Sequence, residues 1–178
     1  MRLIPAVCSA LALAIPLSSV ADEFTLESAS FGSNTTLAET YVYDRGECHG
    51  GNKSPELHWS GAPSDAKSFA VTMFDPDAGD GRGWWHWLMF DIDAKTTELE
   101  AGAGTSAGAV SAKNSFGDTG YSGPCPPRTD KPHRYIFTVY ALRTEKLGLA
   151  RGADVDTVKQ ALERETILST TLQAQYER

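Results

Sequence analysis

The sequence lacks any apolar run long enough to cross a membrane. Its longest run, LIPAVCSALALAIPL at residues 3–17, is shorter than the ~20 residues that a spanning helix needs. The run follows one arginine and precedes the small residues SSVA, which is the layout of a secretory signal peptide cut after Ala21. We therefore predict a signal peptide at residues 1–21, one domain at residues 22–178, and a periplasmic or secreted protein.

Cysteine is also scarce, with three residues in a chain of 178. Cys8 lies in the signal peptide, which leaves Cys48 and Cys125 in the exported chain. Two thiols in an oxidising compartment usually pair, so we predict a disulfide between them. A zinc site would need closer spacing or more histidines, and a catalytic thiol would leave the second cysteine without a role.

Basic residues are few and are not clustered. The chain has 16 Lys and Arg and 23 Asp and Glu, which gives a formal net charge of −7. An acidic surface repels the phosphate backbone of nucleic acids and anionic membrane surfaces. We expect no nucleic-acid partner and no transmembrane segment, and the sequence leaves a homodimer open.

Internal repeats and coiled-coil heptads are missing, and short β-rich runs alternate with Gly, Asp, Pro and Ser. This pattern favours an all-β plan. The clearest expected strands are residues 24–28, 68–75, 86–92 and 133–142. The main expected loops are residues 44–55, 76–83 and 101–132, of which the last is too long to be without a function.

One helix is expected near the C-terminus. Asp154 or Asp156 can cap it, and apolar residues recur at helical spacing through about Glu165. A final strand is expected over residues 167–177, where polar and apolar residues alternate.

The stretch GWWHWLMFDI at residues 83–92 sets one histidine, His86, among three tryptophans. Strand alternation assigns the flanking side chains to two faces: Trp84, His86, Leu88 and Phe90 on one, and Trp85, Trp87 and Met89 on the other. A histidine in such surroundings is either a core residue with a satisfied hydrogen bond or the wall of a pocket.

Polar residues at the ends of the expected strands favour the pocket. His86 and His133 each begin a strand after a loop rich in Gly and Pro, Asp75 ends a strand, and Tyr135 shares the face of His133. A rigid sheet holds such groups toward a ligand where strands meet loops.

The more specific catalytic and metal-binding motifs that the sequence contains lack the context that their function requires. GTSAG at residues 104–108 matches a hydrolase nucleophile motif, but no buried strand precedes it and no helix follows. DPDAGDG lacks the ligand spacing of a calcium loop. A transition metal on Asp75, His86 and His133 stays a minor alternative, because no sharper metal motif supports it.

Five motifs, NKSPELHW, DPDA, WWHW, YSGPCPP and HRY, occur in order along the chain. At these separations they resemble the phosphatidylethanolamine-binding protein family, and most of all its exported bacterial branch, called Raf-kinase-inhibitor-like or YbcL-like. The resemblance runs from about Phe24 to Tyr176. It implies a mainly β fold of two antiparallel sheets with a helix near the C-terminus.

The resemblance also implies a small pocket at the sheet rim that binds phosphate-like anions and phospholipid head groups. Carried over position by position, the ligand-binding residues are Asp75, Trp84, His86, Gly123, Pro126, Pro127, His133 and Tyr135. In this interpretation His86 presents an N–H to the anion and Asp75 fixes the tautomer of a histidine. The chain departs from the family at Gly79, where DPDAP is usual, and at RTD, which replaces a lysine-glycine pair.

We therefore expect a non-enzymatic protein that binds a phosphate- or carboxylate-bearing ligand. We expect no cofactor. The protein could also modulate a partner protein. Two alternatives stay open. One is a hydrolase that uses Asp75 and His86 as an acid–base pair. The other is an inhibitor or host-directed effector that acts through a surface patch.

Overall fold

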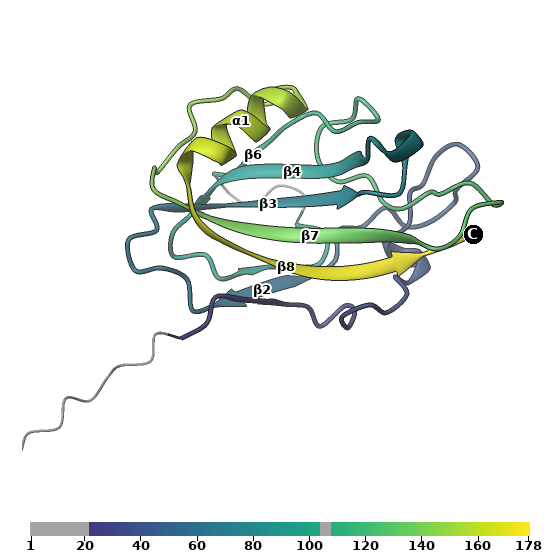
Figure 1. Ribbon diagram of the computed structural model, residues 1–178, viewed down its shortest axis with the longest axis horizontal. Coiled ribbons are helices and arrows are strands. Elements are labelled where there is room, and N and C mark those ends of the chain that lie inside the picture. Colours follow the sequence, from purple (N-terminus) through teal and green to yellow (C-terminus); the bar gives the residue numbers. More distant parts are fainter. Residues whose placement is uncertain (1–21, 104–107) are drawn as a thin grey trace, which may run out of the picture.

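The computed structural model describes residues 22–103 and 108–178, so the predicted signal peptide and the serine of GTSAG lie outside the described residues. Two antiparallel sheets form the body of the fold (Figure 1). The larger has the order β6-β4-β3-β7-β8 and the smaller the order β1-β2-β5. The predicted fold class is confirmed. Within the described ranges no helix has the length and apolarity to cross a membrane.

The strands of the larger sheet are β3 (Ser68–Asp75), β4 (Trp84–Asp93), β6 (Val110–Ser111), β7 (His133–Leu142) and β8 (Thr166–Tyr176). Those of the smaller sheet are β1 (Thr25–Glu27), β2 (Leu57–Ser60) and β5 (Glu98–Leu99). Short 3-10 helices span Glu39–Tyr41 and Gly79–Gly81. The four expected strands and the terminal strand are all present, whereas β2, β5 and β6, with four, two and two residues, were not expected from the sequence.

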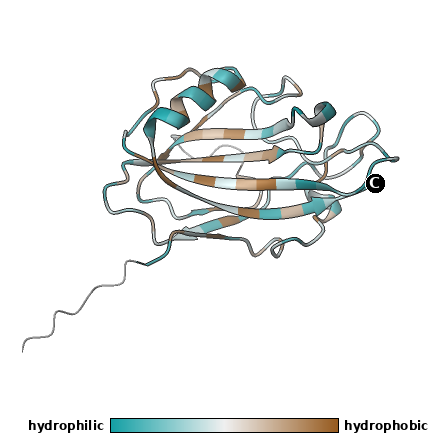
Figure 2. Cartoon of the chain, viewed as in Figure 1, coloured by the Kyte–Doolittle hydropathy of each residue, from teal (hydrophilic) through white to brown (hydrophobic). Residues whose placement is uncertain are grey.

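The helix α1 (Val155–Glu165) begins where the sequence predicts. Asp154 is the N-cap, and its Oδ1 accepts a hydrogen bond of 2.9 Å from the backbone N–H of Thr157. Val158 and Leu162 are buried against the larger sheet, while most of the helix surface is hydrophilic (Figure 2). Amphipathicity and the cap together explain why this segment is helical.

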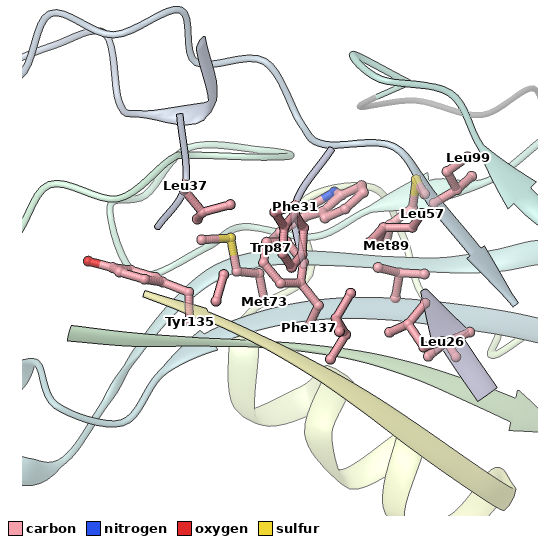
Figure 3. Close-up of a cluster of buried hydrophobic side chains, with 14 of the residues drawn as sticks. Leu26, Phe31, Leu37, Leu57, Met73, Trp87, Met89, Leu99, Tyr135 and Phe137 are labelled. Carbon is pink, nitrogen blue, oxygen red and sulfur yellow. The ribbon is translucent and has the colours of Figure 1, made fainter. Parts of the chain in front are cut away.

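Two apolar clusters hold the layers together. The main one lies between the sheets (Figure 3) and includes Leu26, Trp59, Val71, Met73, Trp87, Met89, Phe137 and Val139. The second lies under α1 and includes Ala70, Leu88, Phe90, Leu142, Val158 and Leu162. The larger sheet is therefore covered on both faces, which explains the nearly continuous burial of β3 and β4.

A β-bulge in β4 overturns the predicted faces of this strand. Phe74 pairs with Trp85 and the adjacent Met73 pairs with Trp87, so His86 is an extra residue without a partner on β3. The bulge reverses the alternation that follows it. Trp85 therefore packs with Leu88 and Phe90 under α1, and the predicted grouping of His86 with those two residues is wrong.

Candidate anion-binding pocket

A cavity of about 200 Å³ opens where β3 ends and where β4 and β7 begin. Its lining residues are Asp75, Ala78, Trp84, His86, Phe116, Cys125, Pro126, Pro127, His133 and Tyr135. The structure thus brings every predicted site residue except Gly123 to one cavity. These residues come together because β3 is antiparallel to both β4 and β7, so the end of β3 lies beside the beginnings of β4 and β7.

Asp75 anchors one side of the pocket. Its Oδ1 accepts hydrogen bonds from the backbone N–H groups of Asp77 at 2.8 Å and Ala78 at 3.2 Å. Its Oδ2 lies 2.8 Å from Nδ1 of His133, and both side chains are buried. A carboxylate only accepts, so Nδ1 of His133 carries a proton toward Asp75, while its Nε2 lies 3.4 Å from Oδ2 of Asp130. Among the described residues Asp75 makes no hydrogen bond to His86, so the two side chains have separate partners.

His86 makes a different set of contacts. Its Nδ1 lies 2.8 Å from the carbonyl oxygen of Ser122 and 3.1 Å from that of Gly123. Because carbonyls only accept, Nδ1 carries the proton, and Nε2 of the neutral ring bears a lone pair. Burial lowers the pKa of His86 and favours this neutral form. His86 is a pocket wall as predicted, and because Nδ1 is bound to backbone carbonyls, only Nε2 of the protonated ring could present an N–H to an anion, which stays a prediction.

Gly123 supports His86 from behind the cavity. Its backbone N–H donates to Oδ1 of Asn52 at 2.8 Å, and its carbonyl accepts from His86. A Cβ at this position would lie 2.1 Å from the carbonyl oxygen of Tyr41. Only glycine fits this close approach of two backbone segments, so the predicted ligand-binding residue acts in this structure as a spacer.

Asn114 supports the pocket from behind His86, and the sequence patterns did not indicate this role. Its buried Nδ2 donates to the carbonyls of His86 and Gly120 at 3.2 and 3.1 Å and to Oγ of Ser122 at 2.8 Å. It thereby joins the bulge of β4 to the segment that binds the His86 ring. The only sequence signal was the unusual length of the loop at residues 101–132.

Phe116 comes from the same loop and covers the mouth of the pocket. Its ring centroid lies 4.6 Å from that of Tyr43, 5.4 Å from that of Trp84 and 5.3 Å from that of His86. It is 36% exposed, so one side of the ring contacts solvent. The aromatic wall therefore extends outward from Trp84 to the protein surface.

Two hydrogen-bond donors of the pocket residues have no partner. Nε1 of Trp84 and the hydroxyl of Tyr135 are both buried and make no hydrogen bond within the described chain. Figure 3 shows the Tyr135 hydroxyl pointing away from the core side chains. Burial raises the pKa of Tyr135, and the charge of Asp75 and its interaction with the hydroxyl add to this effect, so the O–H stays protonated and lies near the Asp75 carboxylate. A buried donor without a partner costs stability, so both groups should destabilise the folded protein slightly.

The disulfide between Cys48 and Cys125 is present as predicted. Cys48 is buried, and Cys125 lines the cavity beside Pro126. The bond therefore ties the loop at residues 44–55 to the wall of the pocket. Among residues 22–103 and 108–178, no group of three His, Cys, Asp or Glu side chains is placed to hold a metal ion.

Comparison with known proteins agrees with this arrangement. The pattern described as phosphatidylethanolamine-binding protein matches residues 27–177. The YbcL protein of Escherichia coli is 40% identical over 169 residues, which cover 92% of each chain. The YbhB protein of the same organism is 41% identical over 122 residues, which cover 66% of this chain and 77% of YbhB.

Solved structures give the same result. The crystal structure of YbcL, described as a new member of the mammalian PEBP family, matches with a TM-score of 0.85 over 88% of this chain and 99% of that chain, at 40% identity. A homologue from Chlamydia trachomatis matches with a TM-score of 0.76 over 87% of this chain and 97% of that one, at 30% identity. The chain therefore belongs to the phosphatidylethanolamine-binding protein family, in its bacterial YbhB/YbcL-like branch.

Proposed function

We propose that the cavity is a binding site for a small oxyanion, either free phosphate or the head group of a phospholipid. The observation that carries this proposal is that two histidines, His86 and His133, line one cavity at the strand ends together with Trp84 and Tyr135. A concave site with a few convergent polar groups is typical of a small-ligand site, and an imidazole N–H can donate to the oxygen atoms of an anion. The cavity volume of about 200 Å³ suits a phosphate and not a whole lipid.

The test is a titration of the protein with inorganic phosphate and with glycerophosphoethanolamine, followed by the NMR signals of the tryptophan indole N–H groups. We expect the Trp84 signal to shift, while that of Trp59, which lies in the core away from the cavity, stays constant. Tyr135→Phe should weaken binding, and Tyr140→Phe on the other face of β7 should not. If no oxyanion moves the Trp84 signal, the proposal is wrong.

We also propose that the protein is exported and that its mature chain begins at Asp22. The support is the signal-like sequence at residues 1–21. The intact mass of the protein recovered from the periplasm or medium decides this point. A mass that still contains residues 1–21, or that shows a lipid on Cys8, would contradict it.

A further inference from the structure

His133 lies between two carboxylates that hold its ring in different ways. Its Nδ1 lies 2.8 Å from Oδ2 of Asp75, and its Nε2 lies 3.4 Å from Oδ2 of Asp130. The side chain of Asp75 is 2% exposed, whereas that of Asp130 is 44% exposed. The first contact is therefore a buried hydrogen bond. The second is a longer contact at the surface, which becomes a weak ion pair when the ring is protonated.

The surroundings of Asp130 allow its carboxylate to leave the ring. Asp130 belongs to the turn before β7, where its backbone N–H donates to the carbonyl of Pro127 at 3.2 Å. Its side chain borders a polar groove of about 730 Å³ that Thr129, Lys131 and His133 also line. A rotation of the side chain into this groove breaks two long contacts, to His133 at 3.4 Å and to the hydroxyl of Thr129 at 3.5 Å. The backbone bond of the turn stays in place.

Positive charge in the small cavity comes from histidine. Among the described residues that line it, none is a lysine or an arginine. Arg134, the neighbour of His133, is bound by Asp77 through its Nε at 2.9 Å and its Nη2 at 2.7 Å. Because Nδ1 of His133 is bonded to Asp75, an oxyanion can bind the protonated ring only at Nε2. That is the nitrogen beside which the Asp130 carboxylate lies.

We propose that Asp130 is an internal competitor of the ligand, and that its carboxylate occupies the anion position at Nε2 of His133 until an oxyanion displaces it. This inference rests on the proposed function of the same cavity. Because both groups are negative and use the same N–H donor, the ligand and Asp130 exclude each other. Asp130 is thus a specificity-determining residue, since a ligand must bind His133 better than the protein's own carboxylate does.

Asp130→Asn tests the competition, because it removes the charge and keeps the size of the side chain. We expect calorimetry with inorganic phosphate and with glycerophosphoethanolamine at about pH 6, near the ordinary pKa of histidine, to show binding about fivefold tighter than in wild type. Asp130→Glu retains a carboxylate and should stay within about twofold of wild type. Asp80→Asn, at an exposed position between β3 and β4, is the control for net charge and should change the affinity less than about twofold.

The wild-type protein gives an independent measurement that needs no variant. Nuclear Overhauser contacts between the ring protons of His133 and the β protons of Asp130 should weaken when phosphate saturates the site. Those between the rings of His86 and Tyr135, whose centroids lie 5.3 Å apart, should persist and serve as the internal control. The measurement separates displacement of Asp130 from a general effect of charge, because a charge effect leaves the side chain where it is.

The outcomes separate the two proposals. Unchanged or weaker binding by Asp130→Asn would show that Asp130 supports His133 and does not compete with the ligand. An equal gain in Asp80→Asn, or Overhauser contacts that persist with phosphate bound, would also overturn the inference, and in all three cases the oxyanion site stands. If neither wild type nor Asp130→Asn binds an oxyanion, both proposals are wrong.

Discussion

Oδ2 of Asp75 lies 2.8 Å from Nδ1 of His133, although 58 residues separate them in the chain. The paired part of β3 and β7 ends at Phe74 and Ile136, so this side-chain bond extends the contact beyond the last backbone pair. This side-chain hydrogen bond holds β3 and β7 together at the rim of the pocket, where backbone hydrogen bonds no longer join the two strands.

Asp75→Ala should destabilise the protein strongly. The change leaves His133 and two backbone N–H groups without their acceptor in a buried place, and breaking such a pair costs about 3–5 kcal/mol. Asp75→Asn keeps an acceptor oxygen and should cost less. Urea unfolding measures both, with Asp65→Asn at an exposed position as the control. A loss below about 1 kcal/mol in Asp75→Ala would show that the bond does not stabilise the rim.

Tyr135→Phe should leave stability unchanged or raise it by about 1 kcal/mol, because the hydroxyl that it removes is buried without a partner. The same variant should bind oxyanions more weakly. This opposite response of stability and affinity is expected of a residue retained for binding. Thermal unfolding and calorimetry on one sample check it, and a clear fall in melting temperature would mean that the hydroxyl bonds within the protein.

The lowered pKa of His86 predicts a pH-dependent stability. In the unfolded chain the ring takes up a proton near pH 6.5, whereas the buried ring stays neutral to a lower pH. The unfolded state binds more protons in this window, so stability should fall as the pH drops below about 6.5, by up to about 1.4 kcal/mol per pH unit.

His58 acts in the opposite direction, because its hydrogen bond to Glu56 raises its pKa. Its contribution is present below about pH 6.5 and is lost as the pH rises through its folded pKa. The measurement is therefore the difference in unfolding free energy between wild type and His86→Asn from about pH 7.5 to 5. A difference that does not change with pH would contradict the neutral assignment of His86.

The Cys48–Cys125 bond should contribute substantially to stability, because it closes a long loop with a sequence separation of 77. The chain-entropy model gives about 4 kcal/mol for this length. Reduction should lower the melting temperature and, because Cys125 lines the cavity, weaken oxyanion binding as well. Exported protein, unfolded without reductant, should show no thiol reactive toward a titrating reagent, and two reactive thiols would refute the pairing.

Much of the fold follows from local patterns in the sequence. Alternation, turn residues and the Asp154 cap locate the long strands and α1, because these signals act within a few residues. The faces of β4 do not follow, since the bulge at His86 depends on how β3 pairs with it. Likewise, strand ends bring Asp75 and His133 together, but only the folded loop shows that Asn114 and Phe116 complete the site.

The extra residue at His86 also divides β4 into two parts that can change independently. Trp84 and His86 belong to the pocket, whereas Trp87, Leu88, Met89, Phe90 and Ile92 pack in the two apolar clusters. Because Trp84 lies before the extra residue, a substitution there can change the pocket without shifting the register in which Trp87 and the later residues pair with β3. The sandwich can thus serve as a fixed scaffold on which pockets of new specificity are engineered.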